Sequence, residues 1–473
     1  MGPEDSDATR DAPFHVMAMP TGPACNLGCE YCYYLNKAEL YPDGEDFRMS
    51  TETLETFVKQ YVEAQPGPEV TFAWQGGEPT LRGLDFYREA VRLQREHAPP
   101  GKRVVNALQT NGTRLDDEWG RFLAENDFLV GLSVDGPPDL HDEFRRTRAG
   151  EPTFEAVAEG LAVLRRHGVR FNVLCVVNAV NARYPLRVYD FFKRLGARWL
   201  QFVPLVELRE ATDGASGRGT AHATGTGTDR DEAPRGEGGG EEPADEFGVP
   251  TGRPTREWVR DRGGDVEASD GDYRAVVEAA RDAPTTDRSV DPVAYGEFVC
   301  AIFDEWVRED VGSVSVRLFD QWLQTGLEGR ASHCVFDETC GDQVAMEHDG
   351  DVYACDHFVE PGFRLGNVHE THLRDLLDDE GQRAFGAYKR EGLPARCREC
   401  DVRRFCHGGC PKNRHLATPD GELGLNYLCA GYRRFFTHAR PYLECFEAAV
   451  EDRRPLSSVT DAVAARDARA GNT

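Results

Sequence analysis

Short apolar runs alternate with amphipathic stretches from residue 14 to residue 207, and this alternation limits the fold more than any other feature of the sequence. The stretches between the runs have helical spacing; one begins at a Ser50 cap and another ends at Gly168, a C-cap residue. Six repeats of this kind predict a parallel sheet with right-handed crossovers. The runs expected to form buried strands are FHVMAMP, VTFAWQGG, RVVNALQTNG, FLVGLSVDG, RFNVLCVVN and WLQFVPLVE.

An open doubly wound sheet and a partial barrel both fit six such repeats. Chemically distinctive motifs follow several different strands at their C-terminal ends, where barrel enzymes place their active sites. The sequence therefore favours an α/β fold with a partial (β/α)6 TIM-like barrel, followed by a cysteine-rich domain. We expect six segments: 1–13, a disordered N-terminus; 14–207, the partial barrel; 208–290, an acidic disordered insertion; 291–330, a helical bridge; 331–440, the cysteine-rich domain; and 441–473, a C-terminal helix and frayed tail.

The charge of the chain limits the classes of partner that it is expected to bind. The net charge is −27, which repels nucleic acid and anionic lipid, so neither is an expected partner. Only six of the 55 basic residues are Lys. Such an acidic, Lys-poor chain fits a halophile-like, salt-rich cytosol, and it fits equally a coding bias that favours Arg.

Neither a secretion signal nor a membrane span is expected. The first residues, MGPEDSDATRDAPF, are acidic, and nowhere do 18 apolar residues follow one another. We therefore expect a cytoplasmic protein. In a reducing compartment its fourteen cysteines point to metal or redox chemistry rather than to structural disulfides.

Three cysteines follow the first predicted strand with the spacing C-x3-C-x2-C: Cys25, Cys29 and Cys32. Four thiolates close a [4Fe–4S] cluster, so three leave one iron open to an amine and a carboxylate. A zinc site with a distant fourth ligand and a chance grouping are the alternatives.

Eight further cysteines form an ordered set in the last third of the chain: Cys334, Cys340, Cys355, Cys397, Cys400, Cys406, Cys410 and Cys429. Eight thiolates suffice for two closed four-iron clusters, while two zinc sites are the alternative because C-x2-C is also half of a zinc ribbon. The remaining Cys175, Cys300 and Cys445 are expected to be small buried hydrophobes.

The segment CNLGCEYCYY resembles the signature of radical S-adenosylmethionine (SAM) enzymes. The resemblance implies a partial (β/α)6 barrel, a cluster whose open iron chelates SAM, and a 5′-deoxyadenosyl radical. It also implies contacts from GGEP to the SAM methionine, from LSVDGPPDLHDEFR to its ribose and carboxylate, and from two other positions to its adenine. The residues concerned are Gly76 and Gly77, Ser133 and Arg145, and Tyr31 and Val206. A solvated Arg145 that pairs locally with Asp142 is the alternative for that residue.

The pattern of C-terminal cysteines resembles the SPASM extension, which carries two auxiliary [4Fe–4S] clusters. The resemblance assigns Cys334, Cys340, Cys355 and Cys410 to the first cluster and Cys397, Cys400, Cys406 and Cys429 to the second. With the N-terminal triplet, the implied cofactors are three [4Fe–4S] clusters and SAM.

The segment GDVYACDHFV resembles the anaerobic sulfatase-maturating enzymes, in which a Cys-Asp at this position supplies the catalytic base. That resemblance implies an oxidoreductase that converts Cys or Ser of a sulfatase to formylglycine, with Asp356 as the base. The implied partners are a peptide segment of the type C/S-x-P-x-R and an electron donor such as ferredoxin or flavodoxin. The alternative for Asp356 is a hydrogen-bonding group that orients the cluster loop.

Two other functions compete with this one. A SPASM maturase that crosslinks a ribosomal peptide usually carries a peptide-binding winged helix, for which the sequence before Phe14 has no room. A non-enzymatic zinc or iron–sulfur binding module would not need the segments expected to face SAM.

Overall fold

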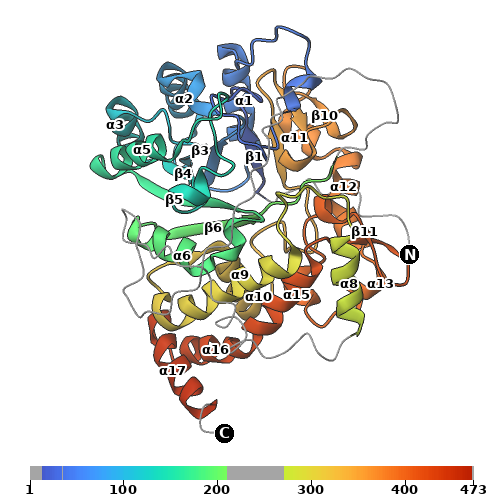
Figure 1. The fold of residues 1–473 in the computed structure, drawn as a ribbon. Coiled ribbons are helices and arrows are strands. Elements are labelled where there is room, and N and C mark those ends of the chain that lie inside the picture. The colour runs from blue at the N-terminus through green and yellow to red at the C-terminus, as the bar shows by residue number, and fades with distance from the viewer. Residues whose placement is uncertain (1–12, 35, 210–270, 471–473) are drawn as a thin grey trace, which may run out of the picture.

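The computed structural model describes residues 13–34, 36–209 and 271–470 (Figure 1). In this part of the chain ten strands form one sheet in the order β10-β9-β8-β1-β2-β3-β4-β5-β6-β7. All neighbours from β8 to β7 are parallel, and β9 and β10 add antiparallel hairpin strands at one edge. The strands are β1 (His15–Ala18), β2 (Glu69–Trp74), β3 (Arg103–Thr110), β4 (Leu129–Ser133), β5 (Arg170–Val177), β6 (Trp199–Pro204), β7 (Ser315–Val316), β8 (Gln343–Met346), β9 (Asp351–Tyr353) and β10 (Arg364–Asn367).

Helices connect the parallel strands and then build the C-terminal part. A separate two-stranded ribbon pairs β11 (Leu416–Ala417) with β12 (Leu423–Leu425). The helices are α1 (Thr51–Ala64), α2 (Leu84–His97), α3 (Asp117–Glu125), α4 (Pro138–His141), α5 (Phe154–Arg166), α6 (Pro185–Arg194), α8 (Gly271–Arg281), α9 (Pro292–Glu305), α10 (Arg317–Glu328), α11 (Leu373–Leu377), α12 (Glu380–Glu391), α13 (Ala395–Arg398), α14 (Arg403–Cys406), α15 (Cys429–Ala439), α16 (Leu443–Glu451) and α17 (Val459–Ala470).

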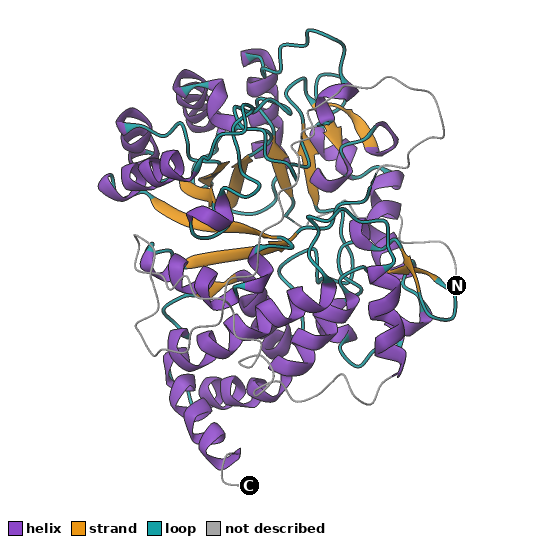
Figure 2. Cartoon of the chain, viewed as in Figure 1, coloured by secondary structure: helices purple, strands orange, loops and turns teal. Residues whose placement is uncertain are grey.

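The predicted β-α repeats are confirmed. Strands β1 to β6 lie side by side in chain order and all run parallel, which brings their carboxyl ends to one edge. Ser50 caps α1 by accepting a hydrogen bond from the Thr53 amide, and Gly168 follows α5 with a left-handed φ of 67°. The curved sheet ends in free edges, as in a partial barrel (Figure 2).

The C-terminal part is joined to the barrel through the same sheet. Strand β8 pairs with β1, and β7 pairs with β6, so both flanks of the six-stranded core are extended by later segments. Helices α9 and α15 cross closely at Gly296 and Gly431, where a Cβ on Gly296 would come within 2.9 Å of the Gly431 Cα. This crossing fixes the start of α15, and with it Cys429, against the barrel.

Two hydrophobic cores stabilise the molecule. One packs α1 and α2 on β1 to β3 around Phe57, Phe72 and Trp74. The other joins β5, β6 and α6 to the C-terminal helices around Phe298 and Trp322. The second core crosses from the barrel into the C-terminal part, so the cysteine-rich segments are held rigidly to the parallel strands.

Two expectations about order are wrong. Residues 271–281, placed in a disordered insertion, form α8, and Tyr273, Val276 and Ala280 are buried. The expected frayed tail contains α17, in which Val459 and Val463 are fully buried. Both helices carry an apolar stripe that the surrounding acidic and small residues conceal in the average composition. Residues 1–12 and 210–270, also predicted to be disordered, lie outside the described residues.

Among the described residues, no helix is both long enough and apolar enough to cross a membrane.

Candidate active site

The three N-terminal cysteines lie in a loop that follows β1 at the carboxyl edge of the sheet. The Cys32 amide donates a hydrogen bond to the Cys29 carbonyl, and the Leu27 amide donates to the Cys25 sulfur at 3.4 Å. Burial, with a smaller contribution from the nearby Glu78, Cys32 and Cys29, raises the pKa of Cys25 to about 12, although the hydrogen bond from the Leu27 amide opposes the rise. The structure thus brings the three thiols together.

The two glycines after β2 let the chain pass directly against this cysteine loop. Gly76 has φ of 113°, and a Cβ on Gly77 would lie 2.2 Å from the Ala24 carbonyl oxygen. The amides of Gly77 and Glu78 donate to the carbonyls of Gly22 and Ala24, each at 2.8 Å. Only glycine fits this approach, so GGEP shapes the cysteine loop.

Glu78 is a buried carboxylate that the sequence reasoning did not single out. It is fully buried and accepts hydrogen bonds from the Thr80 amide and hydroxyl, the Thr110 hydroxyl and the Asn111 amide. Burial raises its pKa, and these hydrogen bonds oppose that rise. Glu78 therefore ties GGEP to the end of β3, and its place within the GGEP motif was the signal in the sequence that could have identified it.

Arg145 is buried and pairs with Asp135. Its Nε lies 3.0 Å from Asp135 Oδ2, while the Tyr31 hydroxyl donates to the same oxygen. Asp142 instead caps the start of α5 by accepting from the amides of Thr153 and Phe154. The alternative of a solvated Arg145 paired with Asp142 is therefore wrong.

The other residues expected to contact SAM lie nearby but differ in exposure. Ser133, at the end of β4, accepts a hydrogen bond from Gln109 Nε2 at 3.0 Å and is partly exposed. Val206 is buried in the second core, whereas its neighbour Leu205 packs with Tyr31.

The first C-terminal group of cysteines converges around Cys410. This thiol is close enough to Cys334, Cys340 and Cys355 to raise the pKa of each one, after the larger effect of burial. His357 Nδ1 lies 3.6 Å from Cys410 Sγ. Burial is the largest single influence on the pKa of Cys410 and raises it, but the hydrogen bond and charge of His357 together with the amide and charge of Lys412 outweigh burial, so the pKa is lowered.

The second group lines one cavity. Cys397, Cys400, Cys406 and Cys429 all face it, together with Asn426 and Arg433. None of the fourteen cysteines, all of which lie in the described residues, forms a disulfide. Each group offers four converging sulfurs, which is the donor set that closes a four-iron cluster.

A tight turn separates the two groups between Cys406 and Cys410. Three consecutive residues, His407, Gly408 and Gly409, have left-handed φ values of 44°, 74° and 63°. The turn directs Cys406 toward the second group and Cys410 toward the first. The glycines of HGGCP are explained by this turn, because left-handed conformations are rare in other residues.

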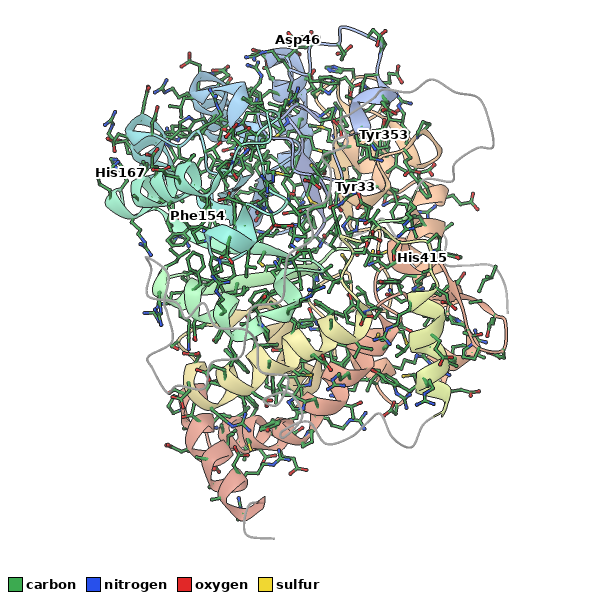
Figure 3. All side chains as sticks on the ribbon, viewed as in Figure 1. Tyr33, Asp46, Phe154, His167, Tyr353 and His415 are labelled. Atoms are coloured by element: carbon green, nitrogen blue, oxygen red, sulfur yellow. The ribbon has the colours of Figure 1, made fainter. Side chains whose placement is uncertain are left out.

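Asp356 lies at the contact between the first group and the N-terminal loop. Cys355 Sγ donates to its Oδ1 at 3.1 Å, and its side chain is 24% exposed. The Tyr33 hydroxyl donates to the His357 carbonyl at 2.7 Å, which anchors this segment to the N-terminal loop. Tyr33 is labelled in Figure 3, where it lies between the N-terminal and C-terminal parts of the chain.

Tyr34 links the two sides of this contact electrostatically. Burial raises its pKa, and Asp356 on one side and Cys32 on the other add to the rise. Tyr34 and His357 were not assigned roles from the sequence, although each lies within two residues of a cysteine in a motif. The hydroxyls of Tyr31 and Tyr33 donate hydrogen bonds to Asp135 and to the His357 carbonyl, respectively.

Comparisons with known proteins agree with this arrangement. Residues 19–192 match the radical SAM superfamily, and residues 328–401 match an iron–sulfur cluster-binding domain, SPASM. The chain is 38% identical to a serine-type anaerobic sulfatase-maturating enzyme of Bacteroides thetaiotaomicron, over 96% of this chain and 97% of the relative. It is 31% identical to a cysteine-type enzyme of Clostridium perfringens, over 91% and 97%.

A solved structure of a similar protein has the same fold. Native anSMEcpe with bound AdoMet and Cp18Cys peptide superposes with a TM-score of 0.69 and 30% identity, covering 91% of this chain and 98% of that one.

Proposed function

The chain belongs to the family of anaerobic sulfatase-maturating enzymes, which are radical SAM enzymes with a SPASM domain, and from this we propose that it oxidises a Cys or Ser of a sulfatase to formylglycine. The family predicted from the sequence is thereby confirmed, and so is the fold. The cofactors of the family are SAM and three [4Fe–4S] clusters, so the alternative of a zinc-binding module is excluded.

We assign the clusters to the three groups of converging thiols described above. The N-terminal triplet provides three ligands and leaves one iron for SAM, and each C-terminal group provides four. We further assign the SAM contacts to Tyr31, Gly76, Gly77, Ser133, Arg145 and Val206. Support for Arg145 comes from Asp135, which holds the guanidinium next to Tyr31 at the edge of the cysteine loop. Support for Val206 comes from its place two residues past the end of β6, at the carboxyl edge of the sheet.

The reaction is a two-electron oxidation of a side chain. When bound, SAM and the clusters supply a radical that takes a hydrogen atom from Cβ and an acceptor for the second electron. The residues of the chain must then remove one proton, from the thiol of Cys or the hydroxyl of Ser, as the C=S or C=O bond forms. Hydrolysis of the thioaldehyde releases hydrogen sulfide and gives the same aldehyde that Ser gives directly.

Asp356 is the group that we assign to take this proton. The observation that carries the assignment is the position of Asp356. It contacts Cys355 of the first C-terminal group of cysteines, which we call the first auxiliary group, as we call the other C-terminal group the second. It also raises the pKa of Tyr34, which lies two residues from Cys32. A carboxylate there lies between the source of the radical and the electron acceptor. If Asp356 served only to orient the cluster loop by hydrogen bonding, its carboxylate would not need to face the N-terminal loop.

The experiment uses anaerobically reconstituted protein with two synthetic peptides, one containing C-x-P-x-R and one containing S-x-P-x-R. Mass spectrometry should detect loss of two hydrogens from the Ser peptide, or replacement of sulfur by oxygen with loss of two hydrogens from the Cys peptide. Release of 5′-deoxyadenosine without an aldehyde on either peptide contradicts the proposed substrate but leaves the radical SAM chemistry in place.

An external electron donor completes the proposal. Cleavage of SAM consumes one electron, and a reduced flavodoxin or ferredoxin of the cytoplasm is a suitable source. Replacing dithionite with such a protein and its reductase should sustain aldehyde formation.

A further inference from the structure

Lys389 is a fully buried cation in the last turn of α12. Its Nζ donates to the backbone carbonyls of Cys334, at 2.6 Å, and of Asp337. Cys334 belongs to the first auxiliary group, so the ammonium lies directly against the backbone that carries one of the proposed ligands. Burying an ammonium is costly unless its charge is compensated.

Arg414 is a second cation in the same region. Its guanidinium donates to four backbone carbonyls, those of His407, Gly408, Gly409 and Lys389, at 2.7 to 3.1 Å. The first three carbonyls belong to the left-handed turn between Cys406 and Cys410. Arg414 therefore lies between the two auxiliary groups and is bonded to the residue that carries the other cation.

Within the part of the chain that the structure describes, neither cation has an acidic partner, because no carboxylate lies within 4.0 Å of Lys389 or Arg414. The groups that face them are cysteine sulfurs, which carry a charge opposite to theirs only as thiolates. Burial, together with the charge of Arg414, lowers the pKa of Lys389 to about 8, while Cys340, Cys334 and Cys410 oppose that fall. Burial likewise lowers the pKa of Arg414, and Cys397, Cys406 and Cys410 oppose it.

We propose that Lys389 and Arg414 are the counter-charges of the two auxiliary clusters, and that Lys389 raises the reduction potential of the first one. The four thiolates of a cluster carry negative charge, and reduction adds more. A fixed positive charge nearby therefore favours the reduced form, because net charge is one of the quantities that set a cluster potential. Lys389 acts as a positioning and electrostatic residue: it makes the first auxiliary cluster a better acceptor for the second electron of the oxidation.

The test measures the midpoint potential of each cluster by redox titration followed by EPR, with iron counted per chain. Lys389→Met removes the charge and the donors, and Lys389→Gln removes the charge but keeps an amide donor. We expect both to lower the potential of the first auxiliary cluster by a tenfold shift in its reduction equilibrium, about 59 mV for one electron. Lys389→Arg keeps the positive charge, so its first auxiliary cluster should have the potential of the unmodified protein.

Lys102 provides a matched control. Its Nζ also donates to two backbone carbonyls, those of Val62 and Gln65, but at the barrel rim away from the cysteines. Lys102→Met should leave all three potentials unchanged.

Two results overturn the inference: full cluster content with an unchanged potential in Lys389→Gln, or loss of the first auxiliary cluster in Lys389→Arg as well as in the neutral variants. Loss of that cluster in the neutral variants alone, with retention in Lys389→Arg, supports it. The inference rests on the auxiliary clusters and not on the identity of the substrate, so a failed peptide assay with intact clusters leaves it standing.

Discussion

The Nε atom of Arg145 lies 3.0 Å from Oδ2 of Asp135, and the two side chains are only 9% and 1% exposed. Asp135 also accepts hydrogen bonds from the Tyr31 hydroxyl and, at 2.9 Å, from the Val176 amide. One carboxylate thus holds a guanidinium, a phenol and the end of β5 in a single arrangement beside the N-terminal cysteines.

Asp135→Ala should leave this buried guanidinium without compensation. Breaking one side of a buried ion pair costs on the order of 3–5 kcal/mol, so the thermal midpoint should fall clearly. The control is Glu69→Ala, which breaks the exposed Arg103–Glu69 pair and should change the midpoint little. Anaerobic circular dichroism measures the thermal midpoint of each variant. Equal decreases in the two would show that the buried pair contributes no more to stability than the exposed pair.

Asp356→Asn should abolish formylglycine formation while SAM cleavage and iron content stay at the level of the unmodified protein. The amide keeps the size of the side chain but cannot take the proton. The control is Asp401→Asn, because Asp401 also follows a cysteine and lies 3.8 Å from Cys400 Sγ, at the second auxiliary group. Normal aldehyde formation in Asp356→Asn would refute the assignment of the base.

Gly77→Ala should damage the N-terminal site selectively. The added methyl would come within 2.2 Å of the Ala24 carbonyl, so the cysteine loop must move. Iron content should fall by about one cluster, and 5′-deoxyadenosine should no longer be released. Gly67→Ala, where the nearest atom is 4.0 Å away, should retain both.

Removal of iron with a chelator should unfold the C-terminal part before the barrel. Metal bonds contribute directly to the stability of such sites, and the auxiliary groups have no disulfides to replace them. Hydrogen exchange should speed up around residues 397–429, while the core around Phe57 and Trp74 stays protected. Uniform loss of protection would show that the barrel also depends on the clusters.

The sequence was sufficient to predict the six parallel strands β1 to β6, each of which begins within one residue of its apolar run. It did not predict the short parallel strands β7 and β8. The carboxyl ends of the six predicted strands were harder to predict, because apolar residues such as Val206 continue past the last strand residue into the candidate active site. The helices α8 and α17 were missed because a few apolar residues define each buried face within a polar composition.

The parts of the site that lie in short sequence motifs of fixed spacing, such as the cysteine motifs, could be predicted from the sequence. Arg145 was harder, because Asp142 is nearer in the sequence than its actual partner Asp135 and only the fold brings β4 and β5 together around that carboxylate. Lys389 and Arg414 could not be found at all from the sequence. Their partners are backbone carbonyls, which leave no trace in residue identity.

The left-handed turn at His407, Gly408 and Gly409 has a consequence for how this protein can evolve and be assembled. Cys406 and Cys410 are only four positions apart, yet they face different groups of thiols. Inserting or deleting a single residue between them would displace a sulfur from at least one of the two groups. The two groups of thiols therefore share one connection of fixed length, and neither can be redesigned while the other is left alone.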